Sequence, residues 1–316
     1  MCFCLLTNWQ DHSYPPCLRP TFLLHKKGVP RNHYVSRIDT VKPENRYIGI
    51  NGLRLHYLDW GGHGKQPMLL LHGFMGHAHV WDAFALEFKK DYHVISLDQR
   101  GHGESEWSQK LAYSIDDHFS DICRFVDILA LDPIIVIGHS MGGRNGLFYA
   151  ACFPERIERL ILVDSRPWAS ESSSNALMQL LIHFPLEAET LEQVVGSIRT
   201  LYPLLAPDVA HHIASYGYRQ TEGGKYVPRY DARMSSQFPK ASFSAENLCS
   251  FLRDIPSPTL IVRGEKSPFL SREDAKRIVD LLPRGMLREI SRSTHMPVQE
   301  NAEEFETVVW EFLNSG

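Results

Sequence analysis

Short apolar runs recur along the chain from about residue 45 onward. Five of them stand out: "MLLLHG", "HVISLD", "PIIVIGHS", "LILVDS" and "TLIVRG". Each has the length of a strand that is buried on both faces, as the strands of a parallel sheet are. Before them, "RYIGINGLRLHYLDWG" predicts two strands around the turn residues Asn51 and Gly52.

Helical stretches separate the apolar runs. They fall at about 78–90, 116–130, 141–152 and 271–282, and "AEEFETVVWEFL" predicts a last helix at the end of the chain. Strands that alternate with helices are typical of an α/β fold. We therefore predict a doubly wound, mostly parallel sheet of about eight strands.

The alternation breaks once, between Asp164 and Thr259. The helical patterns "SNALMQLLIHF", "LEQVVGSIRTLYPLL" and "DVAHHIASYGY" fill this segment, which is too long for a plain loop. It leaves from the carboxyl end of a strand, where ligands bind in open α/β sheets. We predict a weakly ordered extension over 1–40, an α/β core over 41–165 and 256–316, and a helical cap over 166–255. A decorative insertion away from the site is the alternative.

Composition and charge narrow the class of protein. The 316 residues are 43% hydrophobic and 22% charged, which is ordinary for a globular protein, and the formal net charge is −4. No block of like charge favours a nucleic acid or an anionic membrane surface. No apolar run has the length of a membrane-spanning helix, so we expect no stable membrane insertion. These features leave the oligomeric state open.

The six cysteines show neither a disulfide framework nor a zinc spacing, which favours a reducing compartment. The first residues, "MCFCLLTNWQ", make a poor signal peptide. We expect a cytoplasmic protein. An organelle is the alternative if residues 1–40 are a targeting segment.

The motif "GHSMGG" carries the nucleophile candidate, Ser140. It follows the strand "PIIVI" and opens the helix "MGGRNGLFYAA", the context that a nucleophile elbow requires. The hydroxyl is then exposed at a helix N-terminus, where negative charge is favoured. An acyl-transfer enzyme also needs two N–H donors for the oxyanion. We assign them to Phe74, in "LLLHGFMG", and to Met141; His72 is given a structural role.

His295 is the candidate general base. It lies in "EISRSTHMPVQENAEEF", after the last predicted strand and before the last helix. Its imidazole can take the proton of Ser140 and return it to the leaving group.

At this point the chain resembles the α/β-hydrolase fold superfamily, in particular its soluble esterases and related hydrolases with a cap. The resemblance covers roughly residues 45–314 and rests on "HGFMG", "DQRGHGES", "GHSMGG", "RGEKSPFLS" and "THMPVQENAEEF". It implies a serine nucleophile and no cofactor or metal, and it is a poor guide to substrate.

The triad acid is the unsettled position. Many relatives carry it three residues beyond the glycine of "TLIVRG", where this chain has Ser267, which cannot carry negative charge. Asp164 ends the preceding strand and could reach the same crevice, as it does in some esterase families that the chain resembles. We assign the acid to Asp164, with Glu265 as the competitor.

Two further charged residues lie near these motifs. Asp98, in "SLDQRGHGES", precedes Ser140 and is therefore in the wrong chain order for the triad acid of this fold. We give it a structural role, bonded to backbone groups or to Arg100. Arg144 lies on the helix that follows Ser140. We expect it to pair at the helix surface or with a loop, and a contact with a substrate carboxylate is the minority alternative.

These residues predict a serine hydrolase that cleaves a small carboxylic ester or thioester through an acyl-enzyme. The aromatic residues of the predicted cap would either line an apolar pocket or form its core: Trp168, Phe184, Tyr202, Tyr216 and Tyr218. Cleavage of a carbon–carbon bond in a β-diketone-like substrate, or perhydrolase activity, could use the same triad. A non-catalytic small-molecule-binding protein of this fold is the alternative from another class.

Overall fold

The structure is a computed structural model of the whole chain and describes residues 42–168, 171–237 and 251–315. The predicted extension over 1–40 lies outside these ranges, as do the cysteines at positions 2, 4, 17 and 249. The remaining two, Cys123 and Cys152, are free thiols. Within the described ranges, every helix is too short or too polar to cross a bilayer.

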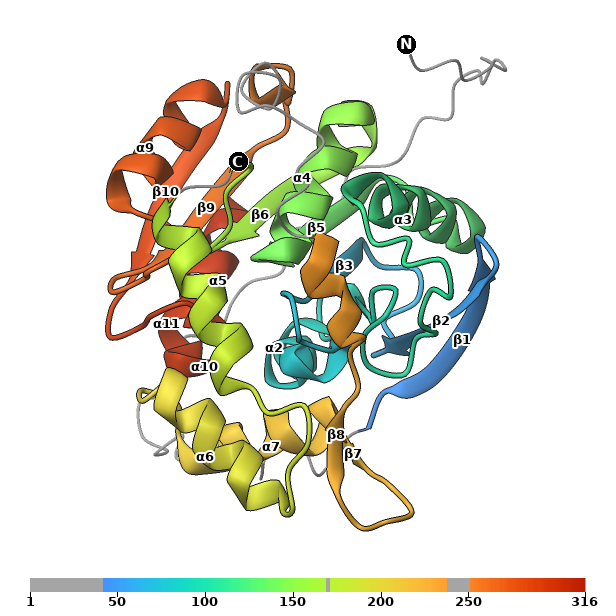
Figure 1. Cartoon of the computed structure of the whole chain (residues 1–316). Helices are drawn as coiled ribbons and strands as arrows, with labels where there is room; N and C mark the ends of the chain where they lie inside the picture. The colour runs from blue at the N-terminus through green and yellow to red at the C-terminus, as the bar shows by residue number, and fades with distance from the viewer. Residues whose placement is uncertain (1–41, 169–170, 238–250, 316) are drawn as a thin grey trace. The chain divides into compact units, whose positions relative to one another are not determined.

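An eight-stranded sheet forms the centre of the fold, in the order β1-β2-β4-β3-β5-β6-β9-β10 (Figure 1). Its strands are β1 (Glu44–Ile50), β2 (Leu53–Asp59), β3 (Pro67–Leu71), β4 (His93–Leu97), β5 (Ile134–His139), β6 (Ile157–Val163), β9 (Thr259–Gly264) and β10 (Gly285–Ile290). The pairs β1–β2 and β2–β4 are antiparallel and the other pairs are parallel. This confirms the predicted mostly parallel α/β sheet.

Helices cover both faces of the sheet. One face carries α3 (Ile115–Leu129), α4 (Met141–Cys152) and α9 (Arg272–Leu281). The other carries α2 (Asp82–Phe88) and α11 (Ala302–Asn314). The short helices η1 (Ala78–Trp81), η2 (Pro154–Arg156) and α10 (Pro297–Glu300) lie in the connections.

The continuous apolar runs follow from this sandwich. In β3, Leu69 and Leu71 pack with the helices of the first face, whereas Met68 and Leu70 pack with those of the second. All four side chains are fully buried. Successive side chains of a strand point to opposite faces, so a strand covered on both sides has no polar positions.

Between β6 and β9 the chain forms α5 (Glu171–His183), α6 (Leu191–Leu201), α7 (Pro207–Gly217), a small hairpin of β7 (Tyr218–Gln220) and β8 (Tyr226–Pro228), and η3 (Ala232–Gln237). The three helices agree with the sequence patterns; the hairpin was not predicted. A separate apolar cluster joins this segment to the loop after β3, with Val194, Ile198 and Ile213 on one side and Met75 on the other. In Figure 1, α6 and α7 lie side by side at one end of the sheet.

Candidate active site

Ser140 lies at a strained turn between β5 and α4. Its backbone has φ 50° and ψ −114°, a conformation that L-residues rarely adopt. Its N–H donates to Val163 O at 2.9 Å, and the hydroxyl of Ser165 donates to its carbonyl oxygen at 2.7 Å. Hydrogen bonds to the end of β6 and to Ser165 just after it therefore keep the backbone in this strained conformation.

The glycines of "GHSMGG" are needed for this turn. A Cβ on Gly138 would lie 2.4 Å from Gly142 O, and one on Gly142 would lie 2.4 Å from Leu71 O. No real side chain is accommodated at such distances, so the close passage of strand and helix depends on both glycines.

His295 and Asp164 are joined by a short hydrogen bond. The distance from His295 Nδ1 to Asp164 Oδ2 is 2.6 Å, and both side chains are buried. Because an ionised carboxylate only accepts, the proton lies on Nδ1, which leaves Nε2 as the basic nitrogen. Asp164 ends β6 with φ 44°, a left-handed conformation that Asp tolerates better than most residues.

Two further donors hold the Asp164 carboxylate. Ser267 Oγ donates to Oδ2 at 2.5 Å, and Gly264 N donates to Oδ1 at 3.1 Å. Ser267 Oγ in turn accepts the N–H groups of Phe269 at 3.1 Å and Leu270 at 3.0 Å. The hydroxyl at the position where relatives often place the acid therefore supports a carboxylate that comes from another strand. The sequence indicated no such link.

Glu265 points elsewhere. Its carboxylate accepts the N–H of Arg292 at 2.8 Å, and its own N–H donates to Ile290 O at 2.9 Å. These two bonds join the loop after β9 to the loop after β10. The carboxylate that bonds His295 Nδ1 is that of Asp164.

The loop that carries His295 packs directly on β9. A Cβ on Gly264 would lie 1.8 Å from Thr294 O, so only glycine permits this approach. The Thr294 hydroxyl donates to Glu300 at 2.7 Å. The ring of Phe269 stacks on the His295 ring, with 3.8 Å between centroids. These contacts fix the imidazole from the backbone and from one ring face.

His139, next to Ser140, is a second imidazole at this site. Its Nε2 donates to His295 O at 2.7 Å. Burial lowers the pKa of His139 to about 3, so the ring stays neutral at physiological pH. It braces the His295 loop.

The loop after β3 lies against Ser140. A Cβ on Gly73 would be 3.3 Å from Ser140 Cβ, which brings the backbone leading to Phe74 beside the nucleophile. His72, given a structural role from the sequence, is fully buried and bonds Gly73 O at 2.7 Å. Burial lowers its pKa to about 4. Met141 is the first residue of α4, where backbone N–H groups have no partner within the helix.

Ser140, Asp164 and His295 line one cavity of about 430 Å³. Apolar side chains from the segment between β6 and β9 form much of its wall, including Leu177, Leu180, Phe184, Ile198, Tyr202 and Ile213. Trp168 also lines it, whereas Tyr218 is buried in the apolar cluster of the segment and Tyr216 stacks on His79. The Ser140 hydroxyl makes no hydrogen bond to His295 within the described ranges; such contacts often tighten only with substrate bound.

In the segment "SLDQRGHGES", the structure decides between the two partners expected for Asp98, backbone groups and Arg100. Asp98 accepts from Ala78 N at 2.6 Å, Glu104 N at 2.9 Å and His56 Nδ1 at 2.7 Å. Its neighbour Arg100 does not pair with it.

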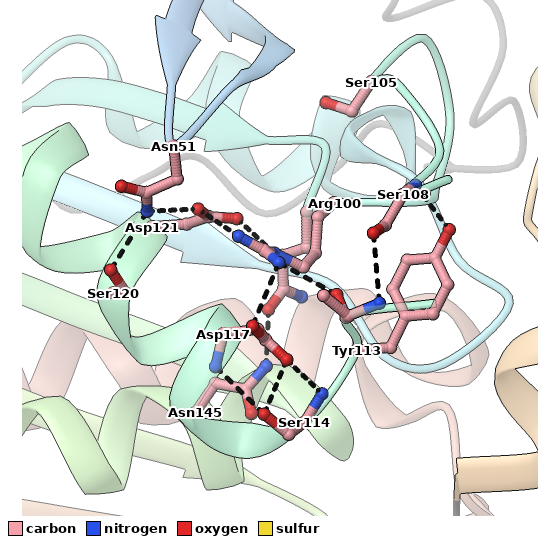
Figure 2. Close-up of polar contacts among 12 residues, drawn as sticks. Asn51, Arg100, Ser105, Ser108, Tyr113, Ser114, Asp117, Ser120, Asp121 and Asn145 are labelled. Carbon is pink, nitrogen blue, oxygen red and sulfur yellow. Dashed lines mark hydrogen bonds and ion pairs between the residues drawn. The ribbon is translucent and has the colours of Figure 1, made fainter. Parts of the chain in front are cut away.

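Arg100 instead donates twice to the carboxylate of Asp121, each time at 2.6 Å, and once to Ala112 O at 2.8 Å (Figure 2). Asn51 donates to the same carboxylate at 2.8 Å. The β1–β2 turn is thereby tied to α3.

One group of side chains could hold a metal ion in the described part of the chain. The ligand atoms of Asp59, His63 and His93 all lie within 4.8 Å of one another. His93 begins β4, so the group lies at the amino-terminal edge of the parallel strands, opposite the edge that carries Ser140. It takes no part in the cavity.

A family model of the alpha/beta hydrolase fold matches residues 66–192. The crystal structure of E-2-(acetamidomethylene)succinate hydrolase has a TM-score of 0.78 at 24% identity, over 86% of this chain and 100% of that one. The chain therefore has the α/β-hydrolase fold.

Curated relatives point to hydrolases of several kinds. A 2-(acetamidomethylene)succinate hydrolase of Mesorhizobium japonicum is 29% identical over 66% of this chain and 74% of its own length. Epoxide hydrolase 4 of Mus musculus is 40% identical, but over 37% of this chain and 34% of the relative. A 2-hydroxy-6-oxononadienedioate/2-hydroxy-6-oxononatrienedioate hydrolase of Burkholderia vietnamiensis is 25% identical over 87% of this chain and 98% of its own length.

Proposed function

We propose that the protein is a serine hydrolase that cleaves a carboxylic ester or thioester through an acyl-enzyme. Ser140 attacks the acyl carbonyl, and His295 accepts its proton and returns it to the leaving group. Asp164 orients the imidazole and stabilises its charged form. The N–H groups of Phe74 and Met141 stabilise the oxyanion. Water, activated by His295, then releases the acid.

The observation that carries this proposal is the 2.6 Å hydrogen bond between Asp164 and His295, beside a serine held in a strained turn at the same cavity. Backbone strain of this kind costs about 1–3 kcal/mol and persists where function requires it. The helical segment acts as a cap whose apolar side chains surround the substrate. The reaction requires no metal or cofactor.

The proposed serine nucleophile restricts which bond of a substrate the enzyme can cleave. A serine alkoxide that attacks a carbonyl gives an ester, which water can hydrolyse through the same oxyanion site. Attack on an epoxide would give an alkyl ether, which has no carbonyl for the second step. Ser140 therefore favours a carbonyl substrate over an epoxide.

Cleavage of a carbon–carbon bond in a β-diketone-like substrate is the second candidate. The Burkholderia relative supports it, because the substrate in its name has a keto group and two carboxylates and no ester. The same triad would serve, with a carbanion in place of an alkoxide as leaving group. A panel of p-nitrophenyl esters of increasing acyl length, compared with a vinylogous diketone, separates the two activities by their specificity constants.

Ser140→Ala tests the mechanism. We expect a loss of about 10⁴-fold or more in kcat with the fold intact, because the change removes one oxygen at a cavity wall. Ser215→Ala, at an exposed serine of α7, is the matched control and should keep full activity. A fluorophosphonate probe should label the wild type and the control but not Ser140→Ala. Retention of a tenth of the wild-type rate would exclude the serine mechanism, and labelling without turnover would favour a binding protein.

A further inference from the structure

Arg144 lies one helical turn beyond Ser140 and lines the same cavity. Its backbone N–H donates to Ser140 O at 3.1 Å, which is the first hydrogen bond of α4. Residues four apart lie on the same side of a helix, with Cβ atoms about 5–6 Å apart. Arg144 and the serine proposed to attack the substrate therefore contribute to the wall of one cavity.

Among the residues that the structure describes, the Arg144 side chain has no partner. No hydrogen bond or ion pair joins it to another residue in the described ranges, and its buried Nε lacks any acceptor. Burial lowers the pKa of Arg144, with no nearby carboxylate to raise it again. Arginine nevertheless keeps its proton inside proteins. The expected pairing with the helix surface or a loop is therefore absent among the described residues.

Other arginines of this fold are neutralised where they are buried. Arg100 donates from Nε and Nη2 to the carboxylate of Asp121 (Figure 2). Arg166, which lines the same cavity as Arg144, forms an ion pair with Asp274 at 2.6 Å. By contrast, Arg144 lines the cavity without an anion from the described part of the chain.

The cavity offers no spare carboxylate. Among its described lining residues Asp164 alone is acidic, and its oxygens already accept from His295, Ser267 and Gly264. A partly buried guanidinium without a partner carries a free-energy cost from lost hydration. A ligand that brings its own anion would remove this cost, and a guanidinium binds a carboxylate through two parallel hydrogen bonds.

We infer that Arg144 binds a carboxylate of the substrate, so that the protein acts on an organic acid whose reactive carbonyl lies a few bonds from that carboxylate. Half-esters of dicarboxylic acids and keto acids have this form. The apolar wall built by Leu177, Leu180 and Phe184 takes the hydrocarbon part. The nature of the reacting carbonyl rests on the proposed function, whereas the carboxylate site does not.

A pair of esters that differ only in charge tests the specificity. Ethyl hydrogen succinate carries a carboxylate where ethyl succinamate carries an amide of the same shape, and both release ethanol. The wild type should prefer the charged ester in kcat/KM. In Arg144→Met this preference should fall by about 10- to 100-fold, which corresponds to the free energy of a hydrogen bond to a charged group. Arg144→Lys keeps a positive charge and should restore part of the preference.

Arg159→Met is the matched control, because Arg159 bonds Glu158 and Ser315 away from the cavity. It should leave the preference unchanged. Fluorophosphonate labelling of Ser140 reports that each variant is folded at the site. An unchanged preference in labelled Arg144→Met would overturn the inference, as would an equal shift in Arg159→Met.

Binding to the Ser140→Ala protein separates this inference from the proposed function. By calorimetry, 4-phenylbutyrate should bind more tightly than its neutral amide, and the difference should vanish in Ser140→Ala/Arg144→Met. If the difference holds but no ester is turned over, the carboxylate site stands and the esterase proposal fails. If esters are turned over and the two ligands bind equally well, the carboxylate site is wrong and the hydrolase proposal stands.

Discussion

The loops that follow β6 and β9 reach the same edge of the sheet and differ in what they bring to His295. The β6 loop supplies the carboxylate, Asp164, in a left-handed backbone conformation. The β9 loop supplies a hydroxyl, Ser267, which donates to that carboxylate and accepts two backbone N–H groups. Its own acidic residue, Glu265, is turned toward Arg292.

In this chain the anion at the imidazole and the hydroxyl that supports it therefore come from two neighbouring strands. What His295 requires is an anion within hydrogen-bond reach of Nδ1, whichever strand supplies it. In the β9 loop, Ser267 stands three residues after Gly264 and supports the anion with its hydroxyl. The four predictions below test each side of this comparison.

Asp164→Asn should give the largest effect, a fall of about 10⁴-fold in kcat at neutral pH. The amide keeps the shape but can present its N–H to the imidazole, which favours the wrong tautomer. It also cannot stabilise the imidazolium that forms as Ser140 attacks. Steady-state kinetics on the preferred ester measures the loss, and a decrease of less than tenfold would remove Asp164 from its proposed role.

Asp164→Asn/Ser267→Asp returns a carboxylate to the site from the β9 loop. Because Ser267 Oγ lies 2.5 Å from the Asp164 oxygen that bonds His295, an aspartate at 267 starts close to the imidazole. We expect about a tenfold gain in kcat over Asp164→Asn, which is roughly 1.4 kcal/mol of barrier. No gain in a folded double variant would mean that the β9 loop can only support the acid.

Ser267→Ala should lower kcat by about tenfold, because it removes one hydrogen bond to a charged group and leaves two loop N–H groups without their acceptor. Ser267→Thr keeps the hydroxyl and is the matched control. Equal activity of the alanine and wild-type proteins would show that Gly264 and the fold position Asp164 without help.

Glu265→Gln should give the smallest effect, a change in kcat within about twofold, since the amide oxygen can still accept from the exposed Arg292 N–H. The melting temperature, measured beside the kinetics, should also change little. A loss as large as that of Asp164→Asn would reverse the assignment of the acid.

The sequence predicted well those elements whose structure depends on residues close together in the chain. Continuous apolar runs predicted strands covered on both faces, and β3, β5 and β6 have that burial. The turn at Asn51 and Gly52 joins β1 to β2 as predicted. The helix predicted over 141–152 coincides with α4, because the elbow motif fixes where strand ends and helix begins.

The sequence was less informative for charged residues, because their partners are distant along the chain. The sequence left Asp98 with backbone groups or Arg100 as partners. The structure shows two backbone N–H groups and His56 on Asp98, whereas Arg100 pairs with Asp121 on α3. Arg144 was expected to pair and has no partner in the described part of the chain.

By itself, the sequence determined the order of strands and helices, the glycine-dependent turn at Ser140 and the candidates for acid and base, because these depend on neighbouring residues and on periodicity. Only the tertiary structure decided that Asp164 rather than Glu265 bonds His295 and that Ser267 supports it. It also decided that Arg144 lines the cavity with no anion from the described residues. Each of these depends on which side chains from distant segments meet at one edge of the sheet, and electrostatic pairing is set by that proximity.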